Sequence, residues 1–338
     1  MLIRISLILS IFMSSNVAYA IKDKNTIFNV SFDTTRELYH DYNKLFKKHW
    51  LKKTGKEVKI YSSFGGSGKQ ARSVMDGLKA DVVTFALSYD IDVIVNKKGL
   101  IDKDWQSEFP DNSSPYLSTV VFLVRKGNPK NIQDWDDLVR DGIEVVTPNP
   151  KSSGGARWNY MAIYSYAITK YNKKKQIRNF IKGVFANVPI LDISSRAATT
   201  TFVARDIGDV VISPESEAYL AIEKMGADKF DIIYPSISIL SEPPIAIVDK
   251  RVDKKGNREL ATEYLQYLYS DKAAEIFVEN HYRPVNKKIL NKYRKKFKKI
   301  KLYSISQLGG WEKFQKEHFN SGALFDQIYH EIVTDTKS

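Results

Sequence analysis

Two turns rich in glycine and serine constrain this sequence most, because each stands where a helix is expected to begin. Residues 63–70 read Ser-Phe-Gly-Gly-Ser-Gly-Lys-Gln, and residues 151–155 read Lys-Ser-Ser-Gly-Gly; apolar residues follow both at helical spacing. Glycine lets the backbone come close to a ligand, and the first turn of a helix offers unpaired N–H groups and about half a positive charge. Two such turns, far apart in the sequence, predict a small anion held from two sides.

The start of the chain has the pattern of a secretory signal peptide. Arg4 gives a positive start, residues 5–13 form an apolar run too short to span a bilayer, and residues 18–20, Ala-Tyr-Ala, form a cleavage site of small residues. We therefore expect residues 1–20 to be a signal peptide and the exported chain to begin at Ile21. The alternative is a retained membrane anchor.

Composition narrows the class of protein further. The 338 residues include 43% apolar residues, enough for two cores, and no cysteine, which excludes a disulfide scaffold and thiol catalysis. The net charge of +13 is compatible with nucleic-acid binding, with an anionic membrane or with a solvated basic surface. The lysines stand in short runs that are rarely interleaved with aromatic residues, so we favour a basic surface and expect no nucleic-acid partner.

Strand-like and helix-like segments alternate along the chain, which predicts an α/β fold with sheets covered by helices. Thr34 and Glu37 match a capping box at the start of the first helix. We expect two lobes, one formed by residues 21–117 and 240–338 and the other by residues 118–239, joined by two crossing strands with the anion in the cleft between them. The strands are expected near residues 28–32, 58–61, 80–86, 118–124, 144–146, 189–191 and 208–212.

Common catalytic motifs are missing from both glycine turns. A phosphate-binding P-loop would need glycine at position 63 and a hydroxyl at position 70, where the chain has Ser63 and Gln70. No G-x-S-x-G turn is present, so Ser67 and Ser153 are expected to be helix caps or ligand donors and not nucleophiles. The five histidines show no metal-ligand spacing, and we expect neither a metal nor a cofactor.

Hydrogen-bond donors matter more than charges for such a site. A dehydrated dianion is costly unless it is paired, and several charge-assisted hydrogen bonds of about 1.5–3 kcal/mol each are needed to hold it. Backbone N–H groups and hydroxyls supply them. Glu215 and Glu217 are interpreted as partners of a helix dipole and not as an acid–base pair. A site of donors alone favours a fully ionised tetrahedral anion over a protonated one.

With these turns and their surroundings, the chain closely resembles the periplasmic sulfate- and thiosulfate-binding proteins of ABC importers. The resemblance covers nearly the whole exported chain, and its strongest motifs are Asn-Val-Ser-Phe-Asp at 29–33, Gly-Gly-Ser-Gly-Lys-Gln-Ala at 65–71 and Pro-Asn-Pro-Lys-Ser-Ser-Gly-Gly-Ala-Arg at 148–157. It implies a two-lobed type II binding-protein fold with two mixed sheets and two hinge strands. It also implies a periplasmic monomer that delivers the anion to an inner-membrane permease.

The resemblance also implies which residues hold the anion. Main-chain N–H groups of four residues and the hydroxyl of a fifth match the family's ligand contacts: Asp33, Ser67, Gly154 and Gly155, with the Ser153 hydroxyl. Ser195 is carried over for its main-chain N–H. Sulfate binders of the family place a tryptophan N–H donor where this chain has Pro214. We therefore hypothesise that Ser213 or Ser216 supplies the missing donor.

Three alternatives remain open at this point. The favoured hypothesis is a solute-binding protein for sulfate or thiosulfate, and the closest alternative is a binding protein for molybdate, tungstate or phosphate. An exported enzyme that acts on sulfate or phosphate esters would need a nucleophile beside a base in the cleft. An adhesin that uses the basic surface would bind polyanions in a salt-sensitive way, without need of the glycine turns.

Overall fold

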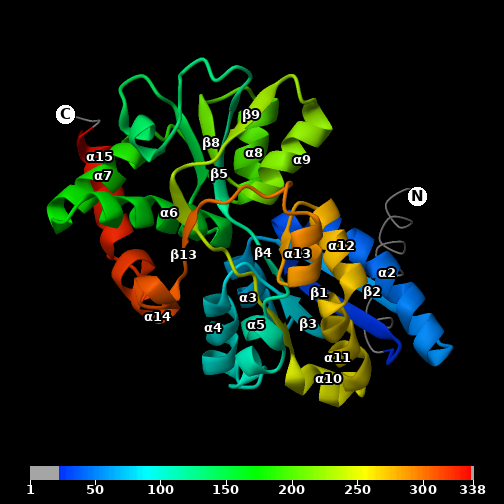
Figure 1. Ribbon diagram of the computed structural model, residues 1–338. Helices are drawn as coiled ribbons and strands as arrows, with labels where there is room; N and C mark the ends of the chain where they lie inside the picture. The colour runs from blue at the N-terminus through cyan, green and yellow to red at the C-terminus, as the bar shows by residue number, and fades with distance from the viewer. Residues whose placement is uncertain (1–22, 336–338) are drawn as a thin grey trace, which may run out of the picture.

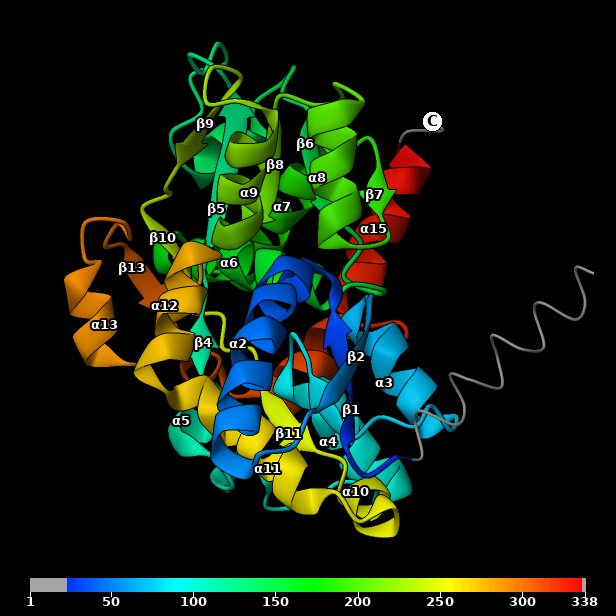
Figure 2. The ribbon, with the colours of Figure 1, turned by 90° about the vertical axis from the view of Figure 1, so that its right-hand side faces the viewer.

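The computed structural model describes residues 23–335 of the chain, and the expected signal peptide lies outside the described residues. Figure 1 shows two lobes stacked one above the other, each built on its own sheet with helices on both sides. Figure 2 shows the same division from the side, with α6 and α8 above and α2 and β1 below the level at which the lobes meet. The predicted α/β fold with two mixed sheets is confirmed.

The first lobe contains a four-stranded sheet in the order β11-β3-β1-β2. Its strands are β1 (Thr26–Phe32), β2 (Lys59–Gly65), β3 (Val82–Thr84) and β11 (Ile245–Ile247); β11 alone among these four runs antiparallel to its neighbour. The helical segments of this lobe are η1 (Asp33–Thr35), α2 (Arg36–Thr54), α3 (Ser67–Met75), α4 (Ser88–Lys98), η2 (Trp105–Ser107), α5 (Pro110–Ser113), α10 (Asp249–Lys255), α11 (Arg258–Gln266), η4 (Tyr267–Tyr269), α12 (Asp271–Glu279) and α13 (Lys287–Lys292).

The second lobe contains a five-stranded sheet in the order β7-β6-β8-β5-β9. Its strands are β5 (Val120–Arg125), β6 (Val145–Pro148), β7 (Leu191–Asp192), β8 (Val210–Pro214) and β9 (Phe230–Ile233), and β5 is antiparallel to both of its neighbours. Helical segments cover it: η3 (Trp135–Val139), α6 (Gly154–Lys170), α7 (Lys174–Ala186), α8 (Ser195–Ala204) and α9 (Glu215–Met225). The unbroken apolar run of β5 is buried throughout residues 120–124, which suits a central strand covered on both faces.

The chain crosses between the lobes at two neighbouring points. Ser118, just before β5, and Ser241, just after β10 (Ile237–Ile239), exchange two main-chain hydrogen bonds of 2.9 Å. Beside them β4 (Tyr116–Leu117) pairs with β12 (Arg283–Pro284). Both crossing segments thus run side by side, where the sequence predicts the hinge.

The end of the described chain packs on the second lobe, which differs from the expected assignment of all of residues 240–338 to the first. β13 (Lys301–Tyr303) pairs with β10, and α15 (Leu324–Asp335) lies along α7. Arg178 of α7 pairs with Glu331 of α15. The remaining segments are η5 (Ser306–Leu308), α14 (Trp311–Phe314) and the π-helical turn η6 (Gln315–Phe319), and Trp311, Phe314, Phe319 and Phe325 share a core with Phe122 of β5. This apolar surface is why the segment joins that lobe.

Candidate functional site

The two glycine turns lie against each other across the boundary between the lobes. Gly66 comes just before α3, and a Cβ on it would lie 3.2 Å from the carbonyl oxygen of Ser152 in the other lobe. Gly154 begins α6, and a Cβ there would lie 2.9 Å from the Ala86 Cβ and 3.2 Å from the Ser67 Cβ. The lobes are therefore closed on each other, and glycine is needed where their backbones meet.

A third helix begins at the same place. Ser195 is the first residue of α8, and a Cβ on Gly155 would lie only 2.0 Å from its hydroxyl oxygen, so the two residues are in direct contact. Ser194 caps α8 and Ser153 caps α6, each hydroxyl accepting a first-turn N–H at 3.3 Å. Both hydroxyl protons remain free to donate after this capping bond, because a serine both donates and accepts.

The side chains of Ser67 and Asp33 are used to hold the site together. The Ser67 hydroxyl donates to Asp90 (2.6 Å) and accepts the Ala86 N–H (3.1 Å). The Asp33 carboxylate, in the turn η1, accepts the main-chain N–H of Arg196 from the other lobe at 3.4 Å. The side chains of both residues are therefore engaged within the protein, and the expected role of their main-chain N–H groups as ligand contacts stays a prediction.

The start of α9 presents few donors. Pro214 has no N–H, and the N–H of Glu215 donates to the Thr119 carbonyl at 2.8 Å. The Ser213 hydroxyl donates to the Pro214 carbonyl (3.2 Å), and Ser213 is not among the residues that line the central cavity described next. Ser216 does line that cavity and is 4% exposed. Of the two serines that the sequence offers for the missing donor, the geometry therefore favours Ser216.

A small cavity lies between the lobes beside these turns, and we call it the central chamber. Its volume is about 20 Å³, and a single water needs about 10–15 Å³, so it is a small enclosed space at the boundary between the lobes. Residues of both lobes and of both crossing segments line it: Phe32, Thr34, Ala86, Ser118, Gly155, Trp158, Ser195, Pro214, Ser216, Ser241, Pro243 and Tyr282. Three of the eight residues predicted for the site line this chamber, namely Gly155, Ser195 and Ser216, whereas Asp33, Ser67, Ser153, Gly154 and Ser213 are not among its lining residues. The role of all eight as ligand contacts stays a prediction.

Two cationic side chains near the turns, Arg196 and Lys151, are paired with carboxylates. Arg196 binds Glu217 of its own lobe through two hydrogen bonds (2.6 and 2.8 Å) and Glu37 of the other lobe (2.9 Å). Lys151 pairs with Asp326 at 2.9 Å. Their charges are thus compensated, and the amides at the helix starts contribute partial positive charge of their own.

The two carboxylates that share Arg196 have pKa values moved in opposite directions. Burial raises the pKa of Glu217 to about 6, and Arg196 only partly offsets this. Burial also acts on Glu37, but hydrogen bonds from Arg196 and Lys224 outweigh it and lower its pKa to about 2. The difference in pKa follows from exposure, since the Glu217 side chain is 1% exposed and the Glu37 side chain is 27% exposed.

The sequence alone did not reveal the partners of these groups. Asp90, which holds Ser67, and Ser118, which lines the chamber, carry no local signal because their roles depend on contacts between distant segments. Glu37 does carry a signal, the capping box, but the structure contradicts that reading: no side-chain cap bond forms at the start of α2, and Glu37 turns to Arg196 instead.

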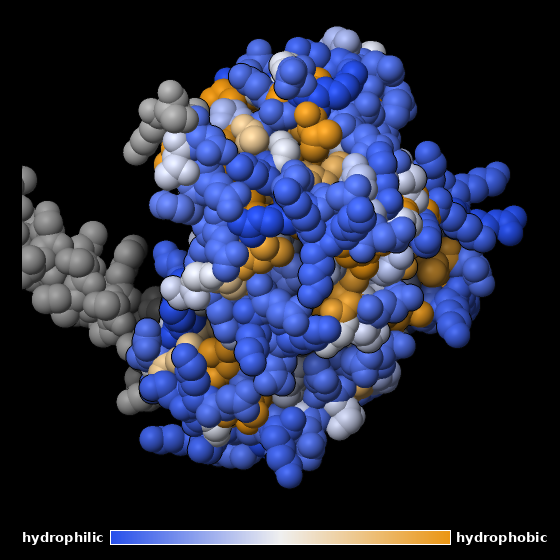
Figure 3. Space-filling view, turned by 90° about the vertical axis from the view of Figure 1, so that its left-hand side faces the viewer, coloured by the Kyte–Doolittle hydropathy of each residue, from blue (hydrophilic) through white to orange (hydrophobic). Residues whose placement is uncertain are grey.

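Two negative findings apply to residues 23–335. No group of three or more histidine, aspartate or glutamate side chains is arranged to hold a metal ion. No helix in that range is both long and apolar enough to cross a membrane. The face drawn in Figure 3 is mostly hydrophilic, and its apolar residues lie in small separate groups.

Comparison with known proteins identifies the family. A family model described as bacterial extracellular solute-binding protein matches residues 30–283. The chain belongs to this family. Among the relatives of this solute-binding protein, a sulfate-binding protein of Escherichia coli is 54% identical over 304 residues, which cover 89% of this chain and 92% of the relative. A thiosulfate-binding protein of Pseudomonas aeruginosa is 45% identical over 90% of this chain and 92% of the relative.

Solved structures support the same assignment. The sulfate-binding protein SubI from Mycobacterium tuberculosis superposes on this solute-binding protein with a TM-score of 0.79 and 33% sequence identity, covering 88% of this chain and all of SubI. The resemblance drawn from the glycine turns is thus confirmed, and so is the two-lobed fold that it implies.

Proposed function

We propose that this chain is the solute-binding component of an ABC importer and binds sulfate or thiosulfate between its lobes. The observation that carries the proposal is the meeting of the two glycine turns across the boundary, with Gly154 against Ser67 and Gly155 against Ser195. Relatives named for sulfate and thiosulfate, similar over nearly nine tenths of the chain, support the same ligands.

The anion would be held by main-chain N–H groups and hydroxyls. The donors are those of Asp33, Ser67, Gly154, Gly155 and Ser195, with the hydroxyl of Ser153. A buried dianion needs several donors at once, and first-turn amides supply them without a mobile side chain. Since Lys151 and Arg196 are bound to carboxylates, these two cations would contribute little directly.

Release of the anion requires the lobes to separate. Residues 21–117 together with 240–300 would move as one body and residues 118–239 as the other. The described residues from 301 onward would follow the second body, because β13 pairs with β10 and α15 packs on α7. The crossing segments at Ser118 and Ser241 would bend as the hinge. The closed form, with anion enclosed, would be the form that an inner-membrane permease receives.

The setting of this function is also a proposal. Residues 1–20 would direct export to the periplasm, where the chain would act as a monomer that binds its anion and performs no chemistry on it. The contacts of Ser67 support a binding role and not a catalytic one. Its hydroxyl donates to the buried carboxylate of Asp90, and among the described residues no histidine or lysine contacts this pair to serve as a base.

Titration calorimetry with four anions tests the proposal. Sulfate or thiosulfate is expected to bind at least about 100-fold more tightly than phosphate, because a protonated oxyanion places an O–H against donors. Molybdate is larger and is expected to fit the chamber poorly. Equal affinity for phosphate, or turnover of an aryl sulfate by the purified protein, would contradict the proposal.

A further inference from the structure

Two buried hydroxyls in the central chamber have no hydrogen-bond partner. They belong to Ser118, on a crossing segment, and Ser216, in the first turn of α9, and both side chains are 4% exposed. Ser216 lies beside the Tyr282 phenol without a bond of good geometry, and that phenol donates to the Thr34 carbonyl at 3.0 Å. Buried hydroxyls are nearly always satisfied in folded proteins, so two in one chamber indicate a bound group.

The wall around these hydroxyls offers little else to an anion. Pro214 contributes a ring without N–H, the Trp158 indole N–H is used by the Ala86 carbonyl (2.9 Å), and Phe32 is apolar. The Thr34 and Tyr282 hydroxyls lie 3.3 Å from each other, and Ser241 lines the chamber as well. A vertex of a tetrahedral anion that turns toward this wall therefore meets serine hydroxyls or an apolar surface. Gly155 and Ser195, at the starts of α6 and α8, also line the chamber.

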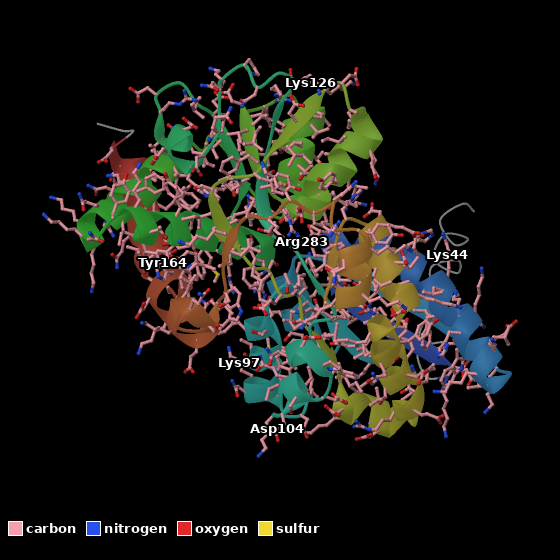
Figure 4. All side chains as sticks on the ribbon, in the orientation of Figure 1. Lys44, Lys97, Asp104, Lys126, Tyr164 and Arg283 are labelled. Carbon is pink, nitrogen blue, oxygen red and sulfur yellow. The ribbon has the colours of Figure 1, made fainter. Side chains whose placement is uncertain are left out.

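Both serines are held firmly in place. Arg283, which Figure 4 shows near the middle of the molecule, binds the buried Glu215 carboxylate with two hydrogen bonds of 2.7 and 2.8 Å. The Glu215 N–H donates to the Thr119 carbonyl, so the first turn of α9 is tied to the crossing segment that carries Ser118. The backbone segments that carry the two serines are thus tied to each other, and a selective contact requires such support.

We propose that Ser118 and Ser216 are ligand contacts that set the choice between sulfate and thiosulfate. Their hydroxyls donate to the vertex of the anion that faces the hinge. An oxygen vertex accepts such bonds strongly, whereas a sulfur vertex is a weak acceptor and tolerates the apolar wall. Thiosulfate therefore places its terminal sulfur here. This inference rests on the proposed function, because it assumes that the chamber holds one of these anions.

Calorimetry on single variants of the full chain tests this assignment. In Ser216→Ala and in Ser118→Ala, sulfate affinity is expected to fall about 10- to 100-fold, the loss of one charge-assisted hydrogen bond. Thiosulfate affinity is expected to fall much less, so the ratio of the two affinities moves toward thiosulfate. Ser213→Ala is the matched control: Ser213 is equally buried but its hydroxyl binds the Pro214 carbonyl, and both affinities are expected to stay unchanged.

Thermal unfolding separates this role from a structural one. Without anion, Ser216→Ala and Ser118→Ala are expected to melt at the wild-type temperature or above it, because removal of an unsatisfied buried hydroxyl relieves its desolvation cost. With sulfate, they are expected to gain less stabilisation than wild type.

Equal factors for the two anions, or no change in either affinity, would overturn the inference. Failure of the proposed function has a different signature, since wild-type protein would then bind neither sulfate nor thiosulfate.

Discussion

One ion pair of this molecule lies inside a lobe and another lies between the lobes. The comparison shows what holds a lobe together and what holds the lobes to each other. Lys255 and Asp81 form a pair of 2.6 Å inside the first lobe, with side chains 1% and 0% exposed. Arg196 and Glu37 form a pair of 2.9 Å between the lobes, with side chains 29% and 27% exposed. A dry pair inside one lobe cannot be opened without unfolding, whereas a partly wet pair between lobes can separate at small cost.

The buried pair is expected to give the largest effect when it is broken. Lys255 also donates to the Thr26 carbonyl (2.8 Å), so Lys255→Met removes one hydrogen bond from that carbonyl and the closest cation from the buried Asp81 carboxylate, which keeps the Phe28 N–H (2.8 Å). We expect a loss of about 3–5 kcal/mol in the free energy of unfolding, measured by urea denaturation. The double variant Asp81→Asn/Lys255→Met removes the charge as well and is expected to recover much of this loss. A double variant no more stable than Lys255→Met would contradict this account.

The substitution Gly154→Ala tests whether the two lobes must close on each other to bind the anion. A Cβ at this position would lie 2.9 Å from the Ala86 Cβ of the opposite lobe, so Gly154→Ala is expected to hold the lobes apart. Affinity for the anion should fall at least about 100-fold by calorimetry, equivalent to about 2.7 kcal/mol, because the amides can no longer converge. Unfolding of the anion-free protein should change little.

Gly68→Ala is the matched control for this substitution. Gly68 lies in the other glycine turn, and a Cβ on it would have no neighbour closer than 3.7 Å, to Asp90. The variant is expected to bind as wild type does and to be slightly more stable, because alanine favours a helix over glycine. If Gly154→Ala and Gly68→Ala bind equally well, the two turns do not close on the ligand.

Much of this organisation could be predicted from the sequence because it is local. Alternation of apolar strands with capped helices located β1, β5, β6 and β8 to within a few residues, and the serine-glycine turns marked the starts of α3 and α6. The contacts that decide specificity and closure are not local. A capping box at Glu37 is a sound local pattern, yet the pairing with Arg196 replaces it, since a guanidinium from the other lobe is the stronger partner.

The prediction of which lobe the last helices join was wrong for the same reason. Nothing near Trp311 or Phe325 in the sequence states which lobe their apolar side chains will cover, and the choice depends on the surface that α6 and α7 leave open. Pro214 was recognised as a position without a donor, but whether Ser213 or Ser216 faces the ligand depends on the end of β8, where the Ser213 hydroxyl closes on the Pro214 carbonyl.

The two carboxylates that share Arg196 refine the comparison through pH. The pKa of buried Glu217 is raised to about 6 from 4.5, so the folded protein binds this proton more tightly than the unfolded chain. Stability therefore falls as pH rises from about 4.5 to about 6, by about 1–2 kcal/mol from this group. The difference in urea unfolding free energy between pH 4.5 and pH 6.5 measures it, and Glu217→Gln should remove this contribution. An unchanged pH dependence in that variant would show that Glu217 does not titrate here.

The smallest effect is expected for the wet pair between the lobes. Glu37→Gln removes the carboxylate that Arg196 and Lys224 share, and exposed pairs of this kind contribute about 0.2–1 kcal/mol. Because the pair forms only when the lobes meet, we expect anion affinity to fall about 2- to 5-fold while the free energy of unfolding of the anion-free protein stays the same.

Salt dependence gives a second test of the same pair. Wild-type affinity for the anion should fall as salt is raised from 10 to 500 mM. The affinity of Glu37→Gln should fall less, because salt screens an ion pair that this variant lacks. Asp253→Asn is a matched control, because Asp253 pairs with Arg258 within the first lobe and should leave both affinity and its salt dependence unchanged. Should Glu37→Gln lower stability without lowering affinity, the pair would hold the first lobe and not the closed form, and the distinction drawn between the two ion pairs would fail.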